Sequence, residues 1–152
     1  MHRPAYCLDT SVLVKALVPE KGSAEAAALL RRIVGGGCRL IAPAFAWAEV
    51  GTVLRKKVRA GLLSESEACA AWMRFLSLSI DYVNDRGLMQ TAWEVAARFA
   101  LPTMYDSAFL ATAEIAARHL GCTVEFWTAD RELVEGLGQI TPEYVRLLAG
   151  LG

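Results

Sequence analysis

The sequence predicts an α/β domain with a largely parallel sheet, because short apolar strands alternate with helices along the chain. Hydrophobic residues make up 55% of the 152 positions, which is enough for a sizeable core. No internal repeat, low-complexity tract or linker interrupts the chain, whose length is usual for one compact domain. Residues 1–152 are therefore expected to form a single domain.

The first predicted strand, residues 6–8, runs directly into a helix over residues 11–17. Pro19 and Gly22 mark the end of that helix, because both residues interrupt regular helical structure. Ser23 is expected to cap the next helix, since a serine oxygen accepts a free backbone N–H at a helix start.

Three glycines at residues 35–37 end this helix, and a second strand is predicted at residues 39–41. Pro43 suits the first turn of the following helix, where its missing N–H costs nothing. That helix is expected to run to about Arg59.

A capping box formed by Ser64 and Glu67 opens another helix. Residues 80–83 follow as a third strand, and their apolar and aromatic side chains suit a pleated surface. Two further helices are predicted, over residues 87–100 and 106–119.

Residues 122–127 form the clearest late strand, with two aromatic residues and a β-branched pair. Asp130 then begins a short helix. The run Thr141-Pro142-Glu143 is expected to start a last helix, because proline is favoured in the first turn.

Four acidic residues stand at the start or on the apolar face of predicted helices: Asp9, Glu49, Asp106 and Asp130. Helix capping explains any one Asp alone. However, Asp9 and Asp130 follow apolar strands, and ligands bind at the carboxyl ends of parallel strands. Glu49 and Asp106 lie on apolar stripes without an obvious local cation. A shared Mg²⁺ or Mn²⁺ explains all four positions with one cause, which indicates a metal-dependent hydrolase.

Composition excludes several other classes of protein. The formal net charge is zero, which argues against broad coating of DNA but allows a local basic patch. The four cysteines contain no CxxC pair, so a zinc site is not expected. No apolar run is long enough for a membrane span, and Asp9 interrupts any signal-peptide segment. A cytoplasmic protein is expected.

Several motifs resemble those of PIN-domain proteins. Residues 8–15, LDTSVLVK, with PEKGS at residues 19–23, resemble the opening of that family. Glu49-Val50, YDSAFLATAE at residues 105–114 and TADREL at residues 128–133 continue the resemblance. The order and spacing of these motifs are similar to those of VapC-type toxin ribonucleases over nearly the whole chain.

The resemblance implies a three-layer α/β/α fold and Mg²⁺- or Mn²⁺-dependent cleavage of RNA. Ser11 and Thr128 would be supporting polar groups near the metal. By position, the catalytic tetrad would be Asp9, Glu49, Asp106 and Asp130. The metal ligands would be Asp9, Asp106 and Asp130.

The resemblance also implies a homodimer that is regulated by a cognate antitoxin protein. Apolar faces on helical residues 68–75 and 95–99 offer surface for such partners. One departure concerns the position three residues after Glu49, which is often Asn in this family and is Thr52 here.

Lys15, Arg55 and Lys56 are candidate contacts to RNA phosphates. For the last two, a solvated helix end explains the positive charge equally well. An alternative function is a haloacid-dehalogenase-like phosphohydrolase, although such enzymes usually carry Asp where this chain has Ser11. A catalytically silent interaction module with the same fold is the remaining alternative.

Overall fold

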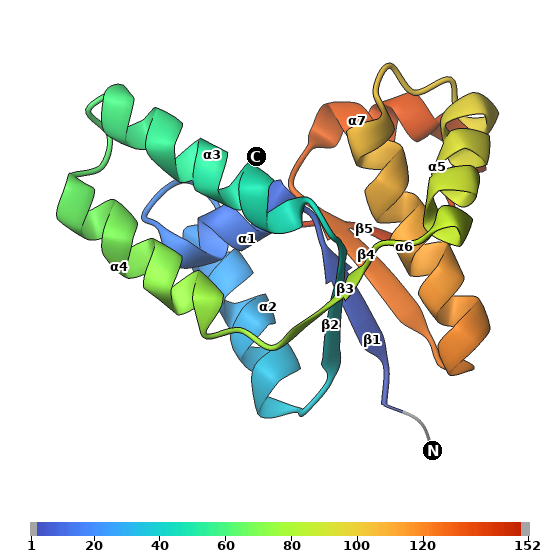
Figure 1. Cartoon of the computed structure of the whole chain (residues 1–152), viewed down its shortest axis with the longest axis horizontal. Coiled ribbons are helices and arrows are strands. Elements are labelled where there is room, and N and C mark those ends of the chain that lie inside the picture. Colours follow the sequence, from blue (N-terminus) through green and yellow to red (C-terminus); the bar gives the residue numbers. More distant parts are fainter. Residues whose placement is uncertain (1–2, 150–152) are drawn as a thin grey trace.

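A five-stranded sheet forms the middle layer of the protein in the computed structural model, which describes residues 3–149 (Figure 1). All neighbouring strands are parallel, and their order across the sheet is β3-β2-β1-β4-β5. The strands are β1 (Ala5–Leu8), β2 (Arg39–Pro43), β3 (Ile80–Val83), β4 (Val124–Thr128) and β5 (Val145–Leu147).

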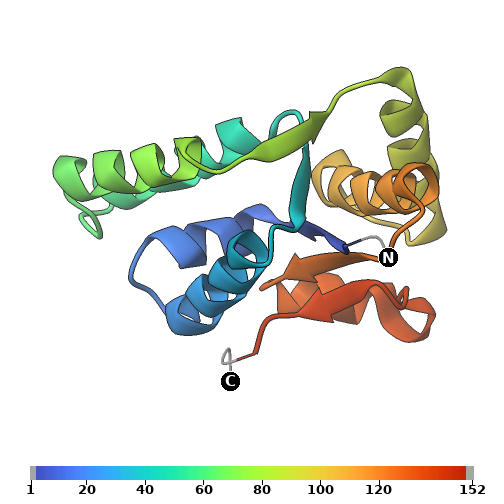
Figure 2. The ribbon, with the colours of Figure 1, turned by 90° about the horizontal axis from the view of Figure 1, so that it is seen from below.

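Helices cover both faces of the sheet, so the fold has the expected three layers (Figures 1 and 2). On one face lie α1 (Thr10–Leu17), α2 (Ser23–Gly35), α3 (Ala46–Arg59) and α4 (Glu65–Leu76). On the other lie α5 (Arg86–Arg98), α6 (Met104–Leu120) and α7 (Arg131–Leu137), followed by a 3-10 turn at Gly138–Ile140. In the part of the chain that the structure describes, no helix is long and apolar enough to span a membrane.

Strand order reverses between β1 and β4. From β1 the chain proceeds to β2 and β3 on one side, and only later adds β4 and β5 on the other side. The carboxyl ends of β1 and β4 are adjacent, with Leu8 in register with Trp127. A crevice at such a reversal is the usual ligand site of an open α/β sheet, so the residues that follow these two strands are well placed for function.

Apolar side chains fill the space on both sides of the sheet. In β1, Ala5 and Cys7 face the α5–α7 side, whereas Tyr6 and Leu8 face the α1–α4 side, as the alternation of a strand requires. Phe126 is fully buried on the first side, and Phe75 is 2% exposed on the second. A sheet buried on both faces explains the high apolar content of the sequence.

The starts of α2 and α3 differ from the sequence prediction. Gly22 occupies the N-cap of α2 with φ of 86°, and Ser23 is already the first helical residue. The Ser23 hydroxyl instead accepts the Glu20 N–H at 2.7 Å and donates to the Val18 carbonyl at 2.6 Å. Pro43 ends β2 rather than starting α3, because at a strand end its missing N–H removes no bond inside the strand.

The predicted last helix at residues 141–143 is also wrong, because β5 forms just after it. The Phe126 N–H donates to the Tyr144 carbonyl at 2.9 Å, and the Leu148 N–H donates to the Thr128 carbonyl at 2.8 Å. These bonds satisfy the outer edge of β4, which would otherwise be unpaired. Leu148 is 3% exposed and packs beside the α1–α4 core.

Much of the apolar stripes predicted as partner surface belongs to the core. Phe75 on α4 and Val95 on α5 are both buried. Other apolar side chains of these helices are exposed, among them Met73 on α4 and Trp93 on α5. Trp72, also within the predicted range, is only partly buried and lines a surface groove. Burial therefore removes only part of the predicted partner surface.

Candidate carboxylate site

Asp9 lies at the carboxyl end of β1, is only 7% exposed and caps α1. Its Oδ1 accepts the backbone N–H of Ser11 at 2.5 Å and the Ser11 hydroxyl at 2.6 Å. Its Oδ2 accepts the Thr128 hydroxyl at 2.6 Å. Burial raises the pKa of Asp9, the bonds from Ser11 and Thr128 oppose that rise, and the charge of Asp130 adds to it.

Ser11 and Thr128 each act as donor and acceptor, and together they join α1 to the segment after β4. The Ser11 Oγ accepts the Ala129 N–H at 3.1 Å, and the Thr128 Oγ1 accepts the Asp130 N–H at 3.0 Å. Both residues predicted as supporting polar groups therefore contact Asp9. They fix its carboxylate from two sides.

Glu49 lies in the first turn of α3 and is partly buried. The Thr10 hydroxyl donates to its Oε1 at 3.0 Å. Burial is the main cause that raises the pKa of Glu49. The Thr10 bond lowers this pKa, and the charges of Asp9 and Asp106 raise it.

Asp106 is the third residue of α6, whose N-cap is Thr103. The expectation that this helix begins at Asp106 is therefore wrong by two residues, and Asp106 is not a cap. Burial raises its pKa to about 6, and the charges of Asp9 and Asp130 contribute to the rise. Neither oxygen of the Asp106 carboxylate accepts a hydrogen bond from residues 3–149, so both oxygens remain available to a ligand.

Asp130 is exposed and is the N-cap of α7, as the sequence predicts. Its Oδ1 accepts the Leu133 N–H at 3.2 Å. This carboxylate therefore has a local structural role as well as an electrostatic effect on Asp9 and Asp106.

The charges of the four acids act on one another. Each charged group that shifts the pKa of Asp9, Glu49 or Asp106 is another member of this set, and each such effect raises the pKa. Among the ion pairs of the described residues, none includes any of the four acids. Clustered carboxylates without a protein cation have the donor chemistry that suits a hard divalent ion.

The cluster is open rather than a finished metal cage. Within residues 3–149, no group of three or more His, Cys, Asp or Glu side chains is arranged to hold a metal ion. Mg²⁺ usually keeps several waters and needs only one or two protein carboxylates. The residues therefore fit a water-rich Mg²⁺-type site and do not fit a closed all-protein site.

Two of the three candidate RNA contacts already have carboxylate partners. Lys15 lies 3.3 Å from Glu20, which Lys57 also contacts at 2.5 Å. Arg55 makes two bonds of 2.7 Å to Glu65. Lys56 has no ion pair among the residues that the structure describes.

Thr52 makes no hydrogen bond to Glu49 among the described residues. Its hydroxyl donates to the Ala48 carbonyl, one helical turn earlier, at 2.7 Å. The side chain is exposed. Thr52 therefore does not orient Glu49 through a hydrogen bond.

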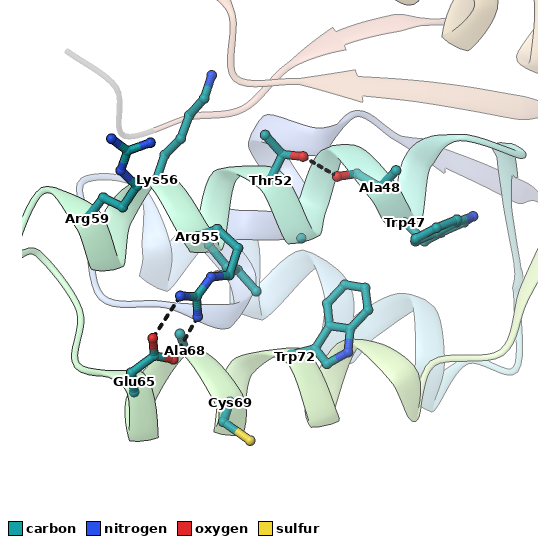
Figure 3. Close-up of a pocket in the computed structure, with 12 residues that line it drawn as sticks. Trp47, Ala48, Thr52, Arg55, Lys56, Arg59, Glu65, Ala68, Cys69 and Trp72 are labelled. Carbon is teal, nitrogen blue, oxygen red and sulfur yellow. Dashed lines mark hydrogen bonds and ion pairs between the residues drawn. The ribbon is translucent and has the colours of Figure 1, made fainter.

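A groove with a volume of about 770 Å³ lies between α3 and α4, which the sequence did not predict (Figure 3). Trp72 of α4 packs against Gly51 of α3, where an added Cβ would lie 3.3 Å from the indole ring. A larger residue at this position would require the ring to shift by a few tenths of an ångström. Trp47 lies toward one end of the groove, and cations border it: Arg55, Lys56 and Arg59.

Comparisons with known proteins identify a family and a similar solved structure. A family model described as PIN domain matches residues 6–135, a range that contains all four acids. The chain is similar to PAE2754 from Pyrobaculum aerophilum, whose crystal structure superposes with a TM-score of 0.57. The two are 25% identical, and the match covers 87% of this chain and 84% of that chain. No match was found among curated proteins.

Proposed function

Because this chain belongs to the PIN domain family, we propose that it is a metal-dependent endoribonuclease that hydrolyses RNA phosphodiesters at the carboxylate site. PIN domains are generally nucleases and commonly use divalent metals such as Mg²⁺ or Mn²⁺. The observation that carries the proposal is that Asp9, Glu49 and Asp106 are buried or partly buried, act on one another's charge, and form no ion pair with a cation among residues 3–149. Such a cluster is costly unless a cation balances its charge.

Each acid would have a distinct role. Asp9, Asp106 and Asp130 would bind a divalent ion partly through its water ligands, because no three acidic side chains of residues 3–149 are arranged to contact one ion directly. The ion would polarise the phosphate and activate water for attack. Asp9 is held rigidly by Ser11 and Thr128, which suits a ligand whose position must not change during reaction. Glu49 Oε2 would orient the attacking water or accept its proton.

RNA cleavage by the purified chain, with and without added Mn²⁺, tests this function. The parent is expected to cleave only with metal, and Asp106→Asn is expected to lose cleavage with its fold retained. Asp81→Asn is the matched control, because Asp81 is an exposed acid on β3 that pairs with Arg39. Equal cleavage by Asp106→Asn and the parent would overturn the mechanism.

We propose further that the protein is a toxin component that a cognate antitoxin inhibits, with an apolar antitoxin segment in the α3–α4 groove. Two features support this partner. The groove floor is apolar, and the cations along its border, Lys56 and Arg59 among them, would attract acidic side chains. A basic antitoxin side chain against the acids is a second route to inhibition.

Substitution of Cys69 separates inhibition from catalysis. Cys69 is exposed on the wall of the groove, and none of the four acids of the candidate site lines this groove. Cys69→Arg is expected to keep RNA cleavage and to lose inhibition by the antitoxin, whereas Cys69→Ser keeps both. Full inhibition of Cys69→Arg would remove the groove as the docking site.

We also propose a homodimer. Met89 and Trp93 are both well exposed and lie four residues apart on α5, so they form one apolar strip. Light scattering at micromolar concentration is expected to give the mass of two chains. A monomer mass would contradict the dimer.

A further inference from the structure

The first turn of α1 binds two different carboxylates. Ser11 donates to Asp9, which is the cap of its own helix, whereas Thr10 donates to Glu49, 39 positions away on α3. Successive helical residues point about 100° apart, so adjacent hydroxyls of one turn reach different neighbours. This turn therefore connects two of the four acids.

The position of Thr10 in its helix explains why its hydroxyl is available. Thr52 and Thr112 lie inside helices, and each donates to the carbonyl four residues earlier, Ala48 and Ala108. Thr10 is the first residue of α1 and has no preceding helical turn. Its hydroxyl is thus free to donate across to α3.

Glu49 needs such a contact because its neighbours repel it. The charges of Asp9 and Asp106 both act against the ionised form of Glu49. A glutamate side chain has three rotatable bonds, so an untethered Glu49 would turn away from these charges. The bond from Thr10 occupies Oε1, and no residue among 3–149 donates to Oε2.

We propose that Thr10 is a positioning residue that holds the Glu49 carboxylate beside Asp9 and Asp106, with Oε2 directed to the reacting groups. This inference rests on the proposed nuclease function and deepens it. Thr10 itself need not touch RNA, because it acts through Glu49. The positioning depends on the Thr10 hydroxyl, which donates the bond to Glu49, and not on the Thr10 methyl group.

Kinetics of Thr10→Val and Thr10→Ser test the role of the hydroxyl. Thr10→Val keeps the shape and loses the donor, so kcat is expected to fall about 10-fold or more with KM changed less than about threefold. Thr10→Ser is expected to restore kcat to within about threefold of the parent. Thr141→Val is the control, because its hydroxyl bonds a backbone carbonyl outside the carboxylate site. An unchanged kcat in Thr10→Val overturns the assignment.

A double-mutant cycle shows whether Thr10 acts through Glu49. In a Glu49→Ala background, Thr10→Val is expected to cause no further loss of the residual cleavage rate. A loss as large as in the parent would mean a general structural role and would overturn the inference.

The four proteins of this cycle are the parent, Thr10→Val, Glu49→Ala and the double variant. They also distinguish a failure of this inference from a failure of the nuclease proposal. If the parent cleaves no RNA, the nuclease proposal fails, and urea unfolding of the four proteins still decides the Thr10–Glu49 contact. A non-additive effect on the free energy of unfolding supports the positioning bond. Additive effects overturn it.

Discussion

Thr128 donates a 2.6 Å hydrogen bond to Asp9, although 119 positions of sequence separate them. The bond joins the carboxyl ends of β4 and β1, which are neighbours where the strand order reverses. The same Thr128 oxygen accepts the Asp130 N–H at 3.0 Å. One buried hydroxyl therefore fixes the side chain of one candidate ligand and the backbone of another.

Thr128→Val is expected to lower the free energy of unfolding by about 1–3 kcal/mol, because it leaves a buried carboxylate oxygen and an N–H without their partner. Thr112→Val is the matched control. Thr112 is equally buried, but its hydroxyl bonds only the Ala108 carbonyl of its own helix. Urea unfolding measures both variants, and equal losses would contradict a special role for Thr128.

The stability of the metal-free protein is expected to depend on the ionisation of Asp106. Its pKa is raised from 3.8 to about 6 in the folded state, so the folded state binds a proton more tightly than the unfolded state does. The stabilising effect of that proton is complete below about pH 4 and is lost as the pH rises through 6. Asp106→Asn has no carboxyl group to ionise and does not undergo this loss. Its free energy of unfolding at pH 7 should therefore be about 1–2 kcal/mol larger than that of the parent.

Urea unfolding of both proteins in a chelator at pH 4 and pH 7 measures this difference. The advantage of Asp106→Asn should be larger at pH 7 than at pH 4. An equal difference at the two pH values would show that the Asp106 carboxyl has an ordinary pKa.

Divalent metal is expected to make the parent more stable than Asp106→Asn, which reverses the order expected without metal. A ligand that binds only the folded state at a hundred times its dissociation constant stabilises it by about 2.7 kcal/mol. Added Mn²⁺ should therefore raise the Tm of the parent and of Asp81→Asn, and should raise that of Asp106→Asn much less. Equal Tm shifts in all three proteins would place the ion elsewhere.

The capping box of α4 provides a prediction about the fold alone. The Ser64 hydroxyl accepts the Glu67 N–H at 3.0 Å, and the Glu67 carboxylate accepts the Ser64 N–H at 2.9 Å. Ser64→Ala is expected to cost about 1 kcal/mol of unfolding free energy. Ser77→Ala at the other end of α4 removes only a hydroxyl that donates to the Arg74 carbonyl, and should cost less. Thermal unfolding of the two variants provides the comparison.

Local patterns predicted most of the fold. The strands that contain Tyr6, Leu40 and Phe126 and the helix that begins after Ser64 follow from apolar periodicity and capping residues. β5 could not be predicted, because its three residues are too few to show a period and depend on pairing with β4. Helix starts near Ser23 and Asp106 were misplaced because several residues there can serve as caps.

The contacts of the carboxylate site were less accessible from the sequence. A carboxylate on an apolar face, such as that of Glu49, indicates that some group must balance its buried charge. The sequence does not show which residue that is. The donor, Thr10, stands 39 positions earlier, and nothing in the local sequence of either residue points to the other. The groove beside Trp72 depends on how α3 and α4 pack against each other. In the sequence, only Gly51 indicates that the two helices come close together.

Because β1 lies between β2 and β4 in the sheet, its contacts on the β4 side form only after the chain has been synthesised as far as β4. Asp9 is synthesised 119 residues before Thr128, so its Oδ2 lacks this donor until Thr128 has also emerged from the ribosome. β1 likewise has no partner on its β4 side until residues 124–128 are made. A nascent chain thus carries an incomplete carboxylate site until Thr128 and Asp130 have been made. Any cleavage activity that needs this site would arise only after that point of synthesis.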